Sequence, residues 1–245
     1  MAGHSKWAKV KHFKGAIDAK RGKIFAKLSK EITVATQIGK SGDPAMNPRL
    51  RMVLLKCRVA SMPRDNIERA IKRGLGDDGG VAYEDLTYEA FGPHGVAILM
   101  DLSTDNRNRT ASEIRSLLSK AGGSIATAGA VSRLFHRKGQ IVVSREAIGE
   151  DRLMELAVEA GAEDFIAHEG GYEILTGPSQ FEAVHKAVEA AGAHCDVAHV
   201  TSLPLVTTTL VAEAGAEVQR LLDALEDHDD VRELFHNAEL PGGVE

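Results

Sequence analysis

Long hydrophobic runs and closely spaced cysteines are absent from the sequence, and each absence excludes a class of protein. No apolar stretch approaches the roughly 18 residues that a transmembrane helix needs. Residues 1–7 carry charge with no apolar stretch behind it, unlike a secretory signal. Cys57 and Cys195 lie too far apart in sequence to suggest a disulfide framework or a CxxC metal site. We therefore expect a cytoplasmic protein with no membrane partner, in a reducing compartment.

Sequence motifs for catalysis or cofactor binding are also absent. Residues 74–79 match the letters GxGxxG, but they follow a predicted helix and place two aspartates where a pyrophosphate would lie. No P-loop, GxSxG or SxxK sequence occurs. The histidines lack metal-ligand spacing: residues 194–199 are interpreted as part of a strand and residues 227–230 as an acidic turn. The sequence thus predicts no enzyme, no cofactor, no metal site and no small-molecule substrate.

Positive charge is scarce after the first third of the 245-residue chain. Residues 1–75 contain 18 Lys and Arg against 5 Asp and Glu, a net charge of +13, whereas the rest of the chain carries −18. Such a distribution predicts a basic module for a polyanion joined to an acidic body. The charge changes sign across the glycine-rich residues 74–80, which we interpret as a flexible linker.

The periodicity of the apolar residues predicts an α+β protein, in which an N-terminal three-helix bundle precedes two ferredoxin-like α+β domains, one inserted in the other. The predicted domains are 1–75, 81–138 together with 203–245, and the inserted 139–202. In the first domain an apolar helical stripe runs from Ile17 to Ile38, Asn47-Pro48 is typical of a helix start, and Pro63 opens a third helix.

The two sheet domains are predicted from alternating strands and helices. The insert has the order βαββαβ, with strands at 141–143, 165–168, 172–175 and about 195–200, and helices at about 150–160 and 179–191. The flanking segments predict strands at 87–91, 96–102, 131–136, 205–210 and 231–235, with helices at about 108–121 and 213–226.

Basic residues near the N-terminus are the main candidates for nucleic-acid contact, because each lysine that meets a phosphate backbone releases condensed counterions. Trp7 lies among them and has a ring that can stack on a base. The alternative is a solvated helix face, as most lysine-rich helices have. The candidate residues are Lys6, Trp7, Lys9, Lys11, His12, Lys14, Lys20, Arg21, Lys23, Lys27 and Lys30.

A second candidate patch is the pair Arg107 and Arg109 at the start of a predicted helix. Asn106 or Asn108 suits the cap of that helix. Arginines are unexpected at the positive end of the helix dipole, and they are accounted for if a phosphate or carboxylate docks on the free amides. The alternative is a salt bridge from these arginines to the acids of the body.

The sequence closely resembles the YebC/PmpR family over nearly its whole length. The resemblance rests on long blocks in the family's usual order: MAGHSKWAKVKH, KRGKIFAKLSKEIT, SGDPAMNPRLR, MPRDNIERAIKRG, YEAFGPHGVAIL, TDNRNRTASEIR and KAGGSIATAGAVSRLFHRKG. It implies a helical N-terminal domain and two ferredoxin-like domains, which agrees with the pattern. It also implies a transcriptional regulatory protein that binds DNA and has no catalytic residues.

Two other functions are compatible with the sequence. Some relatives, including mitochondrial ones, act as translational activators that associate with the ribosome and help synthesis past proline runs, so RNA and the ribosome are alternative partners. The absence of a base-reading motif favours this alternative, since RNA is often recognised by shape and backbone. A small-molecule sensor or enzyme built on the ferredoxin-like pair would need a pocket that the sequence does not reveal.

Overall fold

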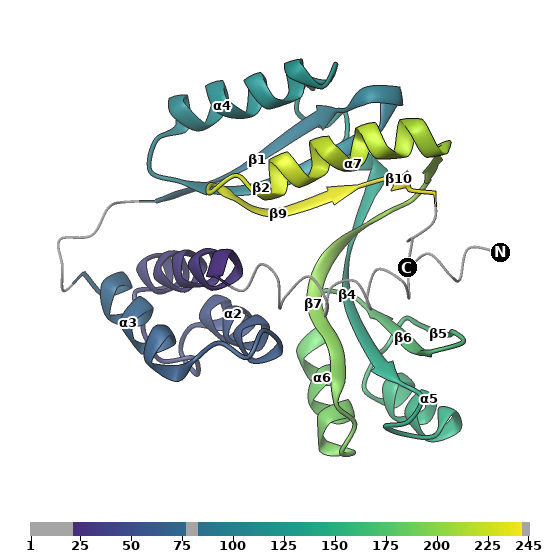
Figure 1. The fold of residues 1–245 in the computed structure, drawn as a ribbon. Coiled ribbons are helices and arrows are strands. Elements are labelled where there is room, and N and C mark those ends of the chain that lie inside the picture. Colours follow the sequence, from purple (N-terminus) through teal and green to yellow (C-terminus); the bar gives the residue numbers. More distant parts are fainter. Residues whose placement is uncertain (1–21, 77–82, 242–245) are drawn as a thin grey trace. The chain divides into compact units, whose positions relative to one another are not determined.

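The computed structural model describes residues 22–76 and 83–241, which divide into two compact units. Unit 1 contains the described residues up to Lys72 together with Arg137–Ser202, and unit 2 contains Arg73–His136 and the described residues from Leu203 onward. Strands β4 (Phe135–Ser144) and β7 (Cys195–Pro204) lie side by side, and each continues from one unit into the other (Figure 1). No helix among the described residues is long and apolar enough to cross a membrane.

Three helices form the first part of unit 1: a helix over 22–39, α2 (Pro48–Val59) and α3 (Arg64–Gly74). Their common core includes Ile32, Leu50 and Cys57, all fully buried. The predicted start of α2 is confirmed, because the Asn47 side-chain oxygen accepts from the backbone N–H of Leu50 at 3.0 Å. The Asn47 amide also donates to two backbone carbonyls of the preceding segment, so one side chain fixes the turn between the helices.

The inserted part of unit 1 is the predicted βαββαβ unit. Its sheet has the order β5-β6-β4-β7, the order of a ferredoxin-like fold, and the pairs β4–β6 and β5–β6 are antiparallel. Residues of both helices enter one core with the sheet, so the helices cover the same face. The remaining elements are α5 (Glu150–Glu159), β5 (Asp164–Ala167), β6 (Gly171–Thr176) and α6 (Phe181–Ala190).

Helix α2 packs on the inserted part through its outer side. Met52 and Leu55 contact the apolar core of the insert. Two arginines of α2 pair with glutamates of α6: Arg51 Nε lies 2.8 Å from Glu182 Oε1, and Arg58 Nη1 lies 3.3 Å from Glu189 Oε1. The helices and the inserted sheet therefore form one compact unit.

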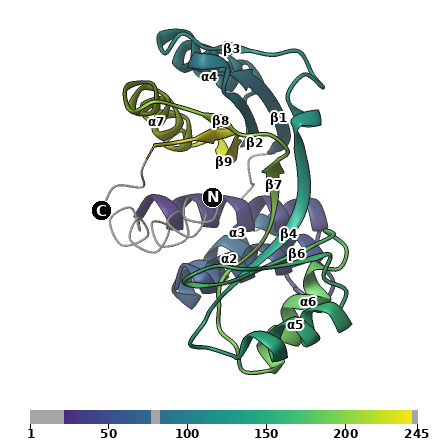
Figure 2. The same ribbon diagram turned by 90° about the vertical axis from the view of Figure 1, so that its right-hand side faces the viewer.

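Unit 2 is an antiparallel sheet in the order β3-β1-β2-β9 with both long helices on one side (Figure 2). Ile98 and Met100 of β2, Ile114 of α4 and Leu225 of α7 lie in its core and are fully buried. The elements are β1 (Glu84–Phe91), the 3-10 turn Pro93–Gly95, β2 (Ala97–Thr104), α4 (Arg107–Lys120), β3 (Ser124–Ile125), α7 (Ala212–Glu226) and β9 (Val231–His236).

Two strands predicted for the domain of residues 81–138 and 203–245 differ from the structure. Residues 131–136 were expected to form a strand, but Ser132–Leu134 are a 3-10 helix and β4 begins at Phe135. The carboxylate of Glu89 accepts the backbone N–H groups of Val131 and Ser132, so these donors are not available to a sheet ladder. The short β3 pairs with β1 instead.

The strand expected over 205–210 is reduced to β8 (Thr208–Thr209), which pairs in parallel with β10 (Ala238–Glu239) near the C-terminus. The fold class is nevertheless as predicted: a helical N-terminal part and two ferredoxin-like α+β parts, one inserted in the other. The exact boundaries of three separate domains stay a prediction.

Candidate nucleic-acid interface

Eight of the candidate residues lie outside the described residues. They are Lys6, Trp7, Lys9, Lys11, His12, Lys14, Lys20 and Arg21. The structure places the remaining five on two elements: Lys23, Lys27 and Lys30 on the helix over 22–39, and Arg107 and Arg109 on α4.

The three lysines of the first helix lie away from its apolar side. Lys23 is exposed and Lys27 and Lys30 are half-buried, whereas Leu28 and Ile32 point into the core. Positions 23, 27 and 30 fall within one third of the helix circumference at about 100° per residue. The three side chains thereby leave the helix on one side, an arrangement that suits a line of phosphates.

Several cations of the helical part form ion pairs inside unit 1. Besides the two arginines that pair with α6, Lys56 Nζ lies 2.8 Å from Glu31 Oε1, which joins α2 to the first helix. Arg64 pairs with Glu68 within α3. The basic excess counted from the sequence is therefore larger than the excess available to a partner.

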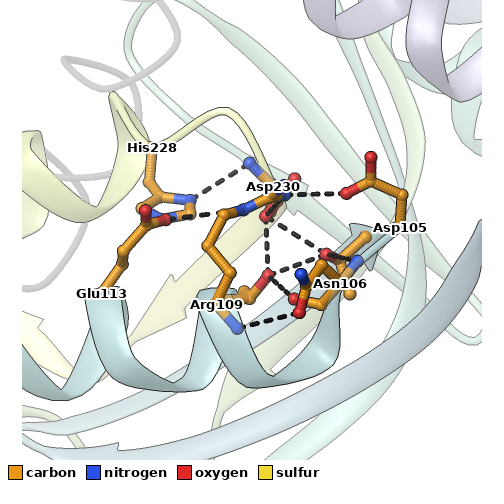
Figure 3. A network of polar contacts seen from close by, with 8 residues as sticks. Asp105, Asn106, Arg109, Glu113, His228 and Asp230 are labelled. Atoms are coloured by element: carbon orange, nitrogen blue, oxygen red, sulfur yellow. Dashed lines mark hydrogen bonds and ion pairs between the residues drawn. The ribbon is translucent and has the colours of Figure 1, made fainter.

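On α4, Arg109 takes part in a network around the carboxylate of Asp230 (Figure 3). Its Nη2 lies 2.8 Å from Asp230 Oδ2 and 2.9 Å from Asp105 Oδ1. Asp230 precedes β9 and its side chain is only 4% exposed. The carboxylates raise the pKa of the Arg109 guanidinium, above all by the hydrogen bond to Asp230. Arg109 thus forms the salt bridge that was the alternative to anion binding.

Two threonine hydroxyls complete this network and orient the start of α4. The backbone N–H of Asn106 donates to Thr104 Oγ1 at 2.9 Å, the two threonine hydroxyls lie 2.7 Å apart, and Thr110 Oγ1 donates to Asp230 Oδ2 at 2.6 Å. Thr104 Oγ1 also lies 3.2 Å from Asp230 Oδ2, so both threonine hydroxyls are within donating distance of this carboxylate. Asn106 is the cap predicted for α4, since its side chain accepts from Arg109 N–H at 3.1 Å.

His228 links the other end of the network to α4. Its Nδ1 accepts the backbone N–H of Asp230 at 3.1 Å, so Nε2 carries the proton that is donated to Glu113 Oε2 at 3.0 Å. Glu113, His228 and Asp230 bring possible ligand atoms within 4.8 Å of one another. A metal ion does not suit this arrangement, because Nδ1 is already an acceptor and Asp230 Oδ2 already neutralises Arg109.

Sequence reasoning missed this cluster because its members are far apart in the chain. Asp230 was interpreted as part of an acidic turn, and its partner Arg109 lies 121 residues away. A single sequence holds no local signal for such a pair. Arg107 differs from its neighbour: it is exposed, and its side chain makes no hydrogen bond or ion pair with any described residue.

The fold and these surfaces define a class of protein: a basic helical part joined to two acidic ferredoxin-like parts, with exposed cations on the first helix and on α4. Family models place it more narrowly. Residues 5–77 match the N-terminal domain of the TACO1/YebC protein, and residues 83–238 match the second and third domains of TACO1/YebC. The chain belongs to this family.

Individual relatives match this chain over its full length or nearly so. The chain is 50% identical over 244 residues to a "probable transcriptional regulatory protein" of Desulforapulum autotrophicum, covering 100% of this chain and 98% of that one. It is 46% identical to a protein of the same description from Treponema denticola, over 100% and 99%. A crystal structure of a conserved hypothetical protein from Aquifex aeolicus matches with a TM-score of 0.80 at 42% identity, covering 93% and 94%.

Proposed function

We propose that this protein is a nucleic-acid-binding regulator of gene expression that acts on DNA. The observation that carries the proposal is the confinement of a net charge of +13 to the first 75 residues, in a chain whose remainder carries −18. The position of Lys23, Lys27 and Lys30 on one side of their helix supports it, because this arrangement suits a line of phosphates. The description of the bacterial relatives as transcriptional regulatory proteins supports it independently.

In this proposal the protein acts in the cytoplasm by binding nucleic acid and not by catalysing a reaction. Burial raises the pKa of Cys57 and of Cys195 to about 12, so neither thiol is a nucleophile at neutral pH. The clustered histidine and carboxylates of unit 2, His228 with Glu113 and Asp230, are occupied by hydrogen bonds.

A second candidate function is that of an RNA-binding translation factor on the ribosome. It is favoured by the lack of a base-reading motif, since backbone and shape recognition are typical of proteins that bind folded RNA. The strongly acidic body would be repelled by nucleic acid, and it would suit basic protein neighbours on such a particle.

The test is a titration of the full chain against a 30-base-pair duplex and a structured RNA at several salt concentrations. We expect the triple variant Lys23→Ala/Lys27→Ala/Lys30→Ala to bind more weakly by roughly tenfold or more. Its salt dependence should also be shallower, by up to about 0.9 in slope for each phosphate that the variant no longer neutralises. Alanine preserves helix propensity, so the fold should survive.

The control is Arg152→Ala, which removes an exposed arginine of α5 that pairs with Glu155. Equal affinity of wild type and triple variant, with the fold intact, would remove these lysines from the interface. A wild-type protein that binds neither polymer even in dilute salt would refute the proposed function. Binding of RNA with no measurable binding of duplex DNA would replace the first candidate by the second.

A further inference from the structure

Helix α4 carries an unusual concentration of positive charge for its surroundings. The described residues of unit 2 contain 8 Lys and Arg against 15 Asp and Glu, and α4 alone holds four of those eight bases with one acid. That acid, Glu113, is bound to His228, and Arg109 is bound to Asp230 and Asp105. The other three cations of the helix are Arg107, Arg115 and Lys120.

These three cations have no partner in the described part of the chain. All three are exposed, and their side chains make no ion pair or hydrogen bond with a described residue. Unit 2 contains more carboxylates than cations. The three cations therefore lack a partner among the described residues although acids are plentiful in the same unit. Arg107 lies at the positive end of the helix dipole, and the two carboxylates there, Asp105 and Asp230, pair with Arg109 and not with Arg107.

The helix surface between Arg115 and Lys120 carries small hydroxylated side chains, whereas Arg107 lies at the first turn, on the side of the helix that bears Ile114. Ser112, Ser116 and Ser119 are exposed on the side of α4 opposite Ile114 and Leu118, which are fully buried in the core. From Arg107 to Lys120 the helix extends about 20 Å, at roughly 1.5 Å per residue. Measured along the axis of a duplex, that length corresponds to about six phosphates of one strand, at roughly 3.4 Å each.

We propose that α4 is a second docking surface for the phosphodiester backbone of a nucleic acid, formed by its outer face between Arg115 and Lys120 together with Arg107 at its first turn. The inference rests on the proposed function and extends it from the basic N-terminal module to unit 2. Guanidinium groups bind phosphate oxygens in pairs, an ammonium binds them as a point charge, and serine hydroxyls donate to them. The short serine side chains let a strand approach the helix closely. Such contacts position the polymer and read no bases.

The charge of the neighbouring helix α7 restricts where a nucleic acid can lie. The exposed residues of α7 include Glu213, Glu217 and Glu226, with Arg220 as the one base of that helix. Because α4 and α7 share one core, an anionic partner is attracted to α4 and repelled by α7. The strand is therefore expected to follow α4 alone and not to spread over both helices.

The test compares two charge-matched triple variants of the full chain. Arg107→Gln/Arg115→Gln/Lys120→Gln removes the three cations of α4. The control, Arg133→Gln/Arg152→Gln/Arg220→Gln, removes three exposed arginines from other elements and changes the net charge equally. Both are titrated with a 30-base-pair duplex and with an RNA hairpin at several NaCl concentrations, after circular dichroism and melting have shown an intact fold.

We expect the α4 variant to bind about tenfold more weakly and the slope of log K against log salt to fall by about 2, whereas the control stays within about twofold. An α4 variant that behaves like the control would overturn the inference. So would competition by poly-glutamate as strong as that by an equal charge of nucleic acid, because the surface would then be a general anion binder.

The same experiment separates this inference from the proposed function. If the lysine variant of the first helix loses affinity and the α4 variant does not, the docking surface is refuted and nucleic-acid binding stands. If the wild-type protein fails to bind either polymer, the proposed function itself fails. A photo-crosslinker at Ser116 should label the bound polymer, while one at Ala216 on the exposed side of α7 should not; equal labelling would contradict the assignment.

Discussion

Two sites, one in each unit, use carboxylates in different ways. Between α2 and the insert of unit 1 the carboxylates form ion pairs at half-exposed positions: the side chains of Arg51 and Glu182 are each 31% exposed. In unit 2 the carboxylates of Asp230 and Glu89 are buried and hold local structure, since Asp230 fixes the start of α4 and Glu89 holds the segment before β4. A half-exposed ion pair contributes little to the free energy of folding, because each group gives up hydration to meet its partner. Removing a buried carboxylate costs more, because its hydrogen-bond donors lose their acceptor and stay buried.

This difference determines which cations are available to a partner. Arg51 and Arg58 of α2 face acids from the insert, so both contribute less to a free basic surface than to the basic count of the sequence. On α4 only Arg109 is engaged by a buried acid, and the other three bases face solvent. The availability of charge is thus set by tertiary partners and not by composition.

The largest effect is expected at Asp230. Asp230→Ala removes an acceptor of Thr110 and the buried charge that balances Arg109, so the free energy of unfolding should fall by about 3 kcal/mol. Asp229→Ala, at the exposed neighbouring position, should change it by less than about 0.5 kcal/mol. Urea denaturation measures both. Similar losses of stability in the two variants would show that the buried network does not stabilise unit 2.

A smaller, pH-dependent effect is expected at Glu89. Its carboxylate is buried, which by itself raises its pKa, but hydrogen bonds from the backbone N–H groups of Gly129, Ser132 and Val131 outweigh burial, so the pKa is lowered. These bonds are 2.7, 2.9 and 2.5 Å long. Their stabilisation is complete above the unfolded pKa of about 4.3 and is lost as the pH falls through the lower folded pKa.

Glu89→Gln should therefore cost about 2 kcal/mol at pH 7, and the gap between the curves of wild type and variant should close as the pH falls from about 5 toward 3. Denaturation at a series of pH values measures it. Glu84→Gln, at an exposed position of the same strand, is the control and should leave the pH profile unchanged. A constant gap down to pH 3 would mean that the charge of Glu89 does not contribute.

The parts of the fold that depend on residues adjacent in sequence could be predicted from the sequence. The Asn47-Pro48 helix start and the βαββαβ order of the insert follow from local signals and are confirmed. The strand expected at 131–136 was wrong because Glu89, about 40 residues away, binds its amides. The sequence could not decide the role of Arg109 for the same reason, since its acid partner Asp230 is separated from it by 121 residues. Periodicity reports which side of an element is apolar and not which distant carboxylate a donor meets.

The smallest effect is expected for the ion pair between the helices and the insert. Arg51 Nη2 donates to Glu182 Oε2 at 3.1 Å, and Lys186 lies 2.8 Å from the same carboxylate. Hydrogen bonds from Lys186 and then Arg51 lower the pKa of Glu182.

A double-mutant cycle of Arg51→Ala and Glu182→Ala should give a coupling below about 1 kcal/mol that weakens with salt, because both side chains are partly solvated and Lys186 stays a second partner. Nucleic-acid affinity of Arg51→Ala should be unchanged, since this cation already has an internal partner. A coupling above about 2 kcal/mol would make this pair as important as the buried carboxylates of Asp230 and Glu89, and the contrast between the two sites would disappear.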